Sequence, residues 1–198
     1  GVVFMDTDGS TRPAKDLRRY PLDGQAFKPM IEASLTWLRT NQQIVNSLIV
    51  FPVPDGDTGT NMVLTMQAAY DEIANSPEHN IGKLVHAVAH GALMGARGNS
   101  GVILSQLWRG FARALDNHET LDGVTLVNAF HQGRNTAYKG VVRPVEGTIL
   151  TVAKDIAAAA EATLKDTEDV YEILEKILPA ADASVQRTPE LLAVLRDA

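Results

Sequence analysis

Apolar residues recur every three or four positions through most of the chain, which is the spacing of one face of an α-helix. The pattern predicts seven helices, over about residues 27–45, 62–73, 81–92, 104–115, 126–141, 149–160 and 170–185. Pro179 predicts a kink or break in the seventh, and Pro189 predicts the first turn of a short eighth helix. No alternating strand pattern is convincing, although residues 48–51 precede two prolines and could be extended. We therefore expect an all-α bundle of eight helices with short loops.

The first 24 residues differ from the rest of the chain. They contain turn-forming pairs such as Asp8-Gly9 and Tyr20-Pro21 and show little apolar periodicity. We expect residues 1–24 to form a tail that is at best partly ordered, and residues 25–198 to form one helical domain. A chain of 198 residues with 45% apolar and 21% charged residues is long enough for a hydrophobic core.

Composition narrows the classes of function. The net charge of −6 and the pI of about 5.3 argue against a broad nucleic-acid surface. The chain has no cysteine, which excludes disulfides, thiolate metal sites and a cysteine nucleophile. No apolar run reaches the roughly 18 residues of a membrane span, and the start does not resemble a signal peptide, so we expect a cytoplasmic protein without a membrane span.

The loop at residues 53–61 combines candidate metal and phosphate ligands. Asp55 and Asp57 are separated by one glycine, so both carboxylates can reach one hard cation such as Mg²⁺. The residues that follow open a predicted helix, whose free amides and positive end favour an anion: Thr58, Gly59, Thr60 and Asn61. A glycine-rich turn capped by aspartate and threonine explains the same residues, and composition alone leaves both interpretations open.

Two further loops place glycine and polar residues before a helix. In the second, Gly98, Asn99, Ser100 and Gly101 could hold phosphate, or Asn99 or Ser100 could simply cap the helix. Gly101 lies inside the helix start and costs about 1 kcal/mol of helix propensity, which indicates that something packs against the backbone there. In the third loop, Thr148 could donate to phosphate and Glu146 could bind ribose or metal. The alternative is again a helix N-cap, and for Glu146 taken alone we favour this structural alternative. If the three loops converge, three positive helix ends surround one pocket.

Several known chemistries are excluded. The chain has no Walker-type phosphate loop, no dinucleotide-binding glycine motif after a strand and no protein-kinase motifs. His86 and His90 are four residues apart on one predicted helix, but no glutamate follows His86 as in zinc proteases, and a structural or solvent role is favoured.

Residues 51–62, 95–101 and 137–152 together resemble the ATP-binding subunit of bacterial fatty acid kinase, whose N-terminal domain belongs to the dihydroxyacetone kinase L-subunit family. The resemblance covers roughly residues 25–198. It implies a barrel of eight antiparallel helices, one or two Mg²⁺ ions on Asp55 and Asp57, and ATP or ADP in the site. It also implies the nucleotide contacts Thr58, Gly59, Thr60, Asn61, Gly98, Asn99, Ser100, Gly101 and Thr148.

The resemblance implies transfer of the ATP γ-phosphoryl group to a fatty-acyl carboxylate carried by a separate fatty-acid-binding protein. The alternatives are the nucleotide subunit of a dihydroxyacetone-type kinase, a non-catalytic regulatory module that holds ADP, and a helical scaffold without a ligand; whether the chain forms a homodimer stays open. Ile49 replaces a polar residue usual in the family, so the metal is expected to have fewer protein ligands. Fatty acid kinase subunits continue past the equivalent of Ala198, so this chain is expected to be one domain of a longer protein.

Overall fold

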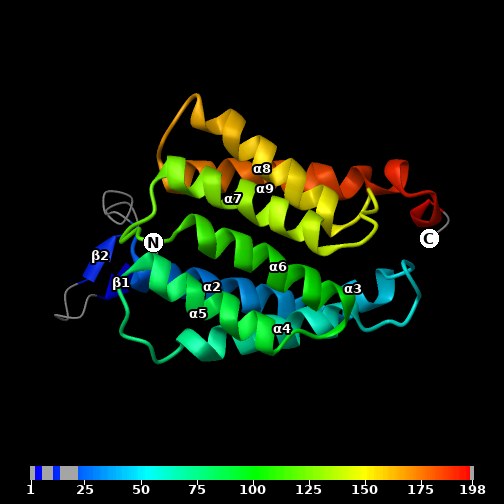
Figure 1. Cartoon of the computed structure of the whole chain (residues 1–198), viewed down its shortest axis with the longest axis horizontal. Coiled ribbons are helices and arrows are strands. Elements are labelled where there is room, and N and C mark those ends of the chain that lie inside the picture. The colour runs from blue at the N-terminus through cyan, green and yellow to red at the C-terminus, as the bar shows by residue number, and fades with distance from the viewer. Residues whose placement is uncertain (1–2, 6–10, 14–21, 197–198) are drawn as a thin grey trace.

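The computed structural model describes residues 3–5, 11–13 and 22–196, and α-helices dominate this part of the chain (Figure 1). The helices are α2 (Gly24–Thr40), α3 (Gln42–Leu48), α4 (Thr58–Ile73), α5 (Ile81–Met94), α6 (Gly98–Ala114), α7 (Gly123–Gly140), α8 (Ile149–Leu164) and α9 (Val170–Leu191). A 3-10 turn, η1 (Ala193–Leu195), follows α9. The predicted all-α fold is confirmed. No helix in the described ranges is long and apolar enough to cross a membrane.

Two short strands lie in the region predicted to be a tail. β1 (Val3–Met5) and β2 (Thr11–Pro13) pair antiparallel, with Phe4 opposite Arg12. The apolar periodicity gave no sign of them, because strands of three residues are too short to show alternation. Further along, Leu22 is buried and forms an isolated bridge with Leu121. The division of the chain at residue 24 stays a prediction.

Successive long helices run antiparallel, so their connections alternate between two ends of the bundle (Figure 1). The connections α3–α4, α5–α6 and α7–α8 lie at one end, which we call the loop end. At the other end the connections are tied together by backbone hydrogen bonds, such as Ile81 N to Glu119 O (3.0 Å) and Leu121 N to Leu22 O (2.8 Å). The three loops singled out from the sequence therefore lie at the same end, as do the N-termini of α4, α6 and α8.

The core is aliphatic, with an aromatic group between α2, α6 and α7. Phe27, Trp108, Phe111 and Phe130 pack in edge and stacked contacts with ring centroids 5.5–6.4 Å apart. The Trp108 indole N–H also donates to the Met66 sulfur at 3.3 Å. The largest side chains that are completely buried are Leu22, Ile73, Ile81, Leu84, Leu115, Leu126, Leu150, Ile173, Val85 and Val88.

The single first helix predicted over residues 27–45 is wrong, because the chain breaks at Asn41 into α2 and α3. The Asn41 backbone N–H and side-chain amide both donate to the Trp37 carbonyl, at 3.1 and 2.8 Å. Asparagine competes in this way for the backbone groups that would continue a helix. The apolar pattern runs through the break, so it did not reveal it.

The predicted break at Pro179 and the predicted helix starting at Pro189 are also wrong, since both prolines lie inside α9. A proline removes one backbone hydrogen bond, but contacts on both sides keep α9 together. Ile173 and Ile177 are buried before Pro179. After it, Ser184 Oγ donates to the Asp155 carboxylate of α8 at 2.6 Å. The bundle still contains eight α-helices among its described residues, but the eighth comes from the split at Asn41.

Gly110 is a test of how closely α6 and α7 pack. A Cβ atom at Gly110 would overlap the backbone carbonyl oxygen of Gln132, which has no room to move within α7. We expect Gly110→Ala to lower the free energy of unfolding by about 1–3 kcal/mol, since overpacking outweighs the gain in helix propensity. Gly140→Ala is the matched control, because its Cβ would meet only the flexible Gln106 side chain, at 3.3 Å. Chemical denaturation measures both, and equal stability of the two variants would contradict this packing.

Asp122 caps α7 and makes stability depend on pH. Its side chain accepts from the Thr125 backbone N–H at 2.7 Å, and this bond lowers the pKa of the Asp122 carboxyl. A depressed pKa in the folded state adds stability above the ordinary pKa of aspartate, and that stability is lost as the pH falls through the folded value. We expect Asp122→Ala to cost about 1 kcal/mol at pH 7 in denaturant titrations. The difference from the parent should vanish in strong acid, whereas a cost that is constant with pH would exclude the carboxylate as its source.

Candidate functional site

The first loop carries two acidic side chains that have no hydrogen-bond or ion-pair partner among the described residues. Asp55 and Asp57 are both exposed. Asp57 holds the N-cap position of α4, yet its side chain makes no capping hydrogen bond. Over the described ranges, neither carboxylate has a hydrogen-bond or ion-pair partner, and the hydrogen bonds of these two residues come from their backbones: Asp55 N–H donates to Val53 O at 2.9 Å, and Asp57 O accepts from the Asn61 amide at 2.8 Å. Both carboxylates are therefore free to bind a cation.

The first turn of α4 offers fewer free amides than the sequence suggested. The amides of Thr58 and Gly59 have no hydrogen-bond partner in the described structure, as expected for the first residues of a helix. The Thr60 amide, in contrast, donates to Asn46 Oδ1 at 3.1 Å, and the Asn61 amide donates to Asp57 O at 2.8 Å. A phosphate on this turn is therefore expected to meet the amides of Thr58 and Gly59 and the hydroxyl of Thr60.

The second loop touches the first. Gly98 opens α6 with φ of 64°, a left-handed backbone that favours glycine. A Cβ there would overlap the Asn61 side-chain amide, so only glycine allows the two helix starts to approach this closely. The Arg97 amide also donates to Thr65 Oγ1 of α4, at 3.2 Å. The structure thus brings the first two predicted motifs together at the loop end.

Asn99 and Ser100 lie within the first turn of α6 and do not cap it. Arg97 occupies the N-cap position and makes no side-chain capping bond, so the interpretation of Asn99 or Ser100 as an N-cap is wrong. The side chains and amides of Asn99 and Ser100 have no partner among the residues described. Gly101 faces Thr65, whose hydroxyl a Cβ would overlap, so this side chain is what packs against the backbone there. Asn99 and Ser100 stay predicted nucleotide ligands.

The third loop is at the same end, but its threonine is already engaged. Thr148 caps α8, accepting from the Leu150 amide at 3.3 Å and donating to the Val145 carbonyl at 2.8 Å. The N-cap interpretation of Thr148 is confirmed. A phosphate bond from this hydroxyl would have to replace the bond to Val145, and it stays a prediction.

Glu146 is held by three side chains instead of facing a ligand. Its carboxylate accepts from Tyr138 at 3.1 Å, from Lys154 at 3.1 Å and from the Thr151 hydroxyl. The bond from Thr151 is the main cause of the lowered pKa of Glu146, assisted by Lys154. Burial, and then the charge of Glu146, raise the pKa of Tyr138 to about 12. This network ties the third loop to α7 and α8, which favours a structural role for Glu146.

A metal ion at the first loop would have few protein ligands. No group of three or more histidine, aspartate or glutamate side chains in the described chain is arranged to hold a metal. His86 pairs with Asp116 and His90 with Glu72, so these two histidines face different elements and the structural role favoured for them fits. Ile49 ends α3 in an extended conformation and supplies no ligand. Among the residues described near this loop, Asp55 and Asp57 stay the predicted direct ligands, and Mg²⁺ usually keeps several waters in such sites.

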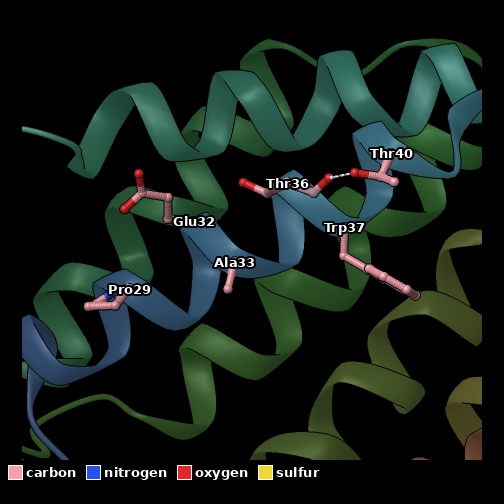
Figure 2. A pocket seen from close by; sticks show the side chains of 6 residues that line it. All are labelled: Pro29, Glu32, Ala33, Thr36, Trp37 and Thr40. Carbon is pink, nitrogen blue, oxygen red and sulfur yellow. Dashed lines mark hydrogen bonds between the residues drawn. The ribbon is translucent and has the colours of Figure 1, made fainter. Parts of the chain in front are cut away.

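A separate hollow lies on the exposed face of α2. It has a volume of about 400 Å³, and Figure 2 shows that its lining comes from one helix: Pro29, Glu32, Ala33, Thr36, Trp37 and Thr40. None of the motif residues lines it. Trp37 is 72% exposed and the floor is a single helix surface, so this hollow is an open groove and does not complete the loop-end site.

Sequence reasoning missed two residues that shape the first loop. Gln42 and Asn46 of α3 donate their side-chain amides to Thr60 Oγ1, at 2.9 and 3.0 Å. They are four residues apart and therefore share one helix face, which is a signal that the sequence did carry. The break at Asn41 hid it, because a single long helix would not place this face against the start of α4.

Comparison with known proteins identifies the family of this chain. Residues 52–198 match the DAK2 domain family, and this range contains all three loops. Uncharacterized proteins from Staphylococcus aureus strains USA300 and bovine RF122 / ET3-1 are each 49% identical over 176 residues, or 89% of this chain. The chain spans 32% of the length of these relatives. Since the family match covers most of the chain, the chain belongs to the DAK2 domain family.

Proposed function

We propose that this domain binds Mg²⁺·ATP at the loop end and serves a kinase that phosphorylates a fatty-acyl carboxylate. One observation carries the proposal. Two unpartnered carboxylates, Asp55 and Asp57, stand directly before a helix start with unused amides, and that start touches a second one at Gly98. Membership of the DAK2 domain family, which belongs to the kinases, supports the same reading.

The chemistry of these groups fits a metal-bound polyphosphate. Carboxylate oxygens are the ligands that Mg²⁺ prefers, and helix N-termini favour phosphate. When bound, Mg²⁺ would neutralise charge on the phosphate oxygens. The domain has a net charge of −6, so the attraction of ATP must be local rather than spread over the surface. The amides of Thr58, Gly59, Asn99 and Ser100 supply partial positive charge at that place.

In phosphoryl transfer the main task of the protein is to position the substrates. A carboxylate oxygen of the acceptor forms a bond to the γ-phosphorus, and the bond from that phosphorus to the β,γ-bridging oxygen breaks, giving an acyl phosphate and ADP. The acceptor is already ionised at neutral pH, so no general base is needed. This agrees with a loop end whose described polar groups form no acid–base dyad, since Glu146 is occupied by its own network.

The fatty-acyl acceptor rests on the resemblance of the first loop. Thr58 follows Asp57 here, as in the fatty-acid branch, whereas the dihydroxyacetone branch usually has histidine at this position. In the fatty-acid branch the acyl chain is carried by a separate binding protein, so the domain alone should bind ATP and turn over little. Two apolar side chains in or near this loop in the sequence, Leu48 and Val53, are exposed.

The paired aspartates are the first test. We expect Asp55→Asn with Asp57→Asn to lower the affinity for Mg²⁺·AMP-PNP more than about tenfold, equivalent to ~1.4 kcal/mol, in isothermal titration calorimetry. Asp166→Asn is the control, because Asp166 is an exposed aspartate in the α8–α9 connection at the opposite end. Unchanged affinity in the double variant, or an equal loss in the control, would remove the metal site.

The acceptor is tested separately with the full-length protein and its partners. We expect ATP- and Mg²⁺-dependent acyl phosphate, trapped as a hydroxamate, when a fatty acid is offered on an acyl-binding protein. Phosphorylation of dihydroxyacetone instead would assign the domain to the other kinase branch. ADP that stays bound through purification and does not exchange with ATP would identify a non-catalytic regulatory module.

A further inference from the structure

The short helix α3 holds Thr60 through three hydrogen bonds. Asn46 makes two of them, donating from Nδ2 to Thr60 Oγ1 at 3.0 Å and accepting from the Thr60 amide at Oδ1 at 3.1 Å. Gln42 makes the third, donating from Nε2 to the same hydroxyl oxygen at 2.9 Å. The two backbones are also in contact, because a Cβ at Gly59 would overlap the Gln42 carbonyl oxygen.

These bonds leave the Thr60 hydroxyl one role. A hydroxyl oxygen has two lone pairs and one proton. The side-chain amides of Gln42 and Asn46 occupy both lone pairs, and the orientation of Asn46 is fixed because its oxygen already accepts the Thr60 amide. The hydroxyl proton has no acceptor among the residues that the structure describes. Thr60 can therefore only donate, and the group that it meets must be an acceptor.

The packing of α3 agrees with a role in holding Thr60. None of its residues is buried, and two of its apolar side chains, Ile44 and Leu48, are 58% and 66% exposed. The half-buried residues Gln42, Val45 and Asn46 form the face that lies against the first turn of α4, with Val45 beside Gly59. Since no side chain of α3 is fully buried, apolar burial contributes little to its position, and the three hydrogen bonds to Thr60 help to hold it against α4.

We propose that Gln42 and Asn46 are positioning residues that fix Thr60 as a hydrogen-bond donor to a phosphate oxygen of the bound nucleotide. The inference rests on the proposed function. It assigns a role to Gln42 and Asn46 of α3, which lie outside the three motif loops. Phosphate oxygens only accept hydrogen bonds, so a hydroxyl that can only donate selects such a ligand. Fixing it in advance also lowers the entropic cost of binding.

The substitution Asn46→Asp changes the direction in which the Thr60 hydroxyl donates its proton, with little change in the shape of residue 46. The new carboxylate still accepts the Thr60 amide, but it has no N–H and draws the hydroxyl proton to itself. We expect the affinity for Mg²⁺·AMP-PNP, measured by calorimetry on the same chain, to fall at least tenfold. Ser47→Asp adds the same charge to the neighbouring exposed residue, which does not contact Thr60, and should change affinity less than threefold.

A double-mutant cycle shows whether Asn46 acts through Thr60. Thr60→Val removes the hydroxyl and Thr60→Ser keeps it, so affinity should fall in the first and be nearly retained in the second. In the Thr60→Val background, Asn46→Asp should cost less than threefold. An equal cost in both backgrounds, or equal effects of Asn46→Asp and Ser47→Asp, would overturn the inference.

The measurements distinguish a variant that does not fold from a failure of the proposed function and from a failure of the role of α3. Circular dichroism and thermal melting check each variant, and Gln42→Glu replaces Asn46→Asp if that variant does not fold, since glutamate likewise has no amide donor. A parent chain that does not bind Mg²⁺·AMP-PNP would refute the proposed function itself. A parent chain that binds, with Asn46→Asp and Gln42→Glu unchanged in affinity, would refute only the role of α3.

Discussion

Antiparallel packing of neighbouring helices is the constraint on which the rest of this structure depends. It requires close contact between backbones, such as that of Gly110 with α7, and it places alternate connections at the same end of the bundle. Three sequence-distant loops lie at the loop end for this reason. None of the connections between the described helices α4 to α9 has to cross the molecule, because the direction of each helix already decides where its N-terminus lies.

The fold could largely be predicted from the sequence, because each long helix buries a continuous apolar stripe. Residues such as Ile73, Leu84 and Leu126 repeat with helical spacing and are buried as that spacing implies. The errors came from local polar competition and from tertiary support. Asn41 ends a helix through its own side-chain amide, and Pro179 is tolerated because α8 holds the second half of α9. Neither effect leaves a trace in apolar periodicity.

The candidate site was predictable in its residue types and less so in its hydrogen bonds. Gly98 and Asn61 are in contact, which joins the first two motifs. Thr148 and Thr60 have similar sequence contexts, since each lies at a helix start directly after a glycine. The Thr148 hydroxyl donates its proton to the Val145 carbonyl, whereas the Thr60 hydroxyl accepts from Gln42 and its proton has no acceptor among the described residues. The difference is set by residues outside the motifs, so reading each motif alone could not reveal it.

The weak attachment of α3 has a thermodynamic consequence. A helix with no buried side chain can detach from the bundle at low cost, and in the detached state nothing orients Thr60. In the proposed site, nucleotide binding and docking of α3 are then linked equilibria, so each favours the other. A protein that binds the exposed side chains of Ile44 and Leu48 would shift the same equilibrium. It would raise or lower the affinity for nucleotide without contacting the nucleotide.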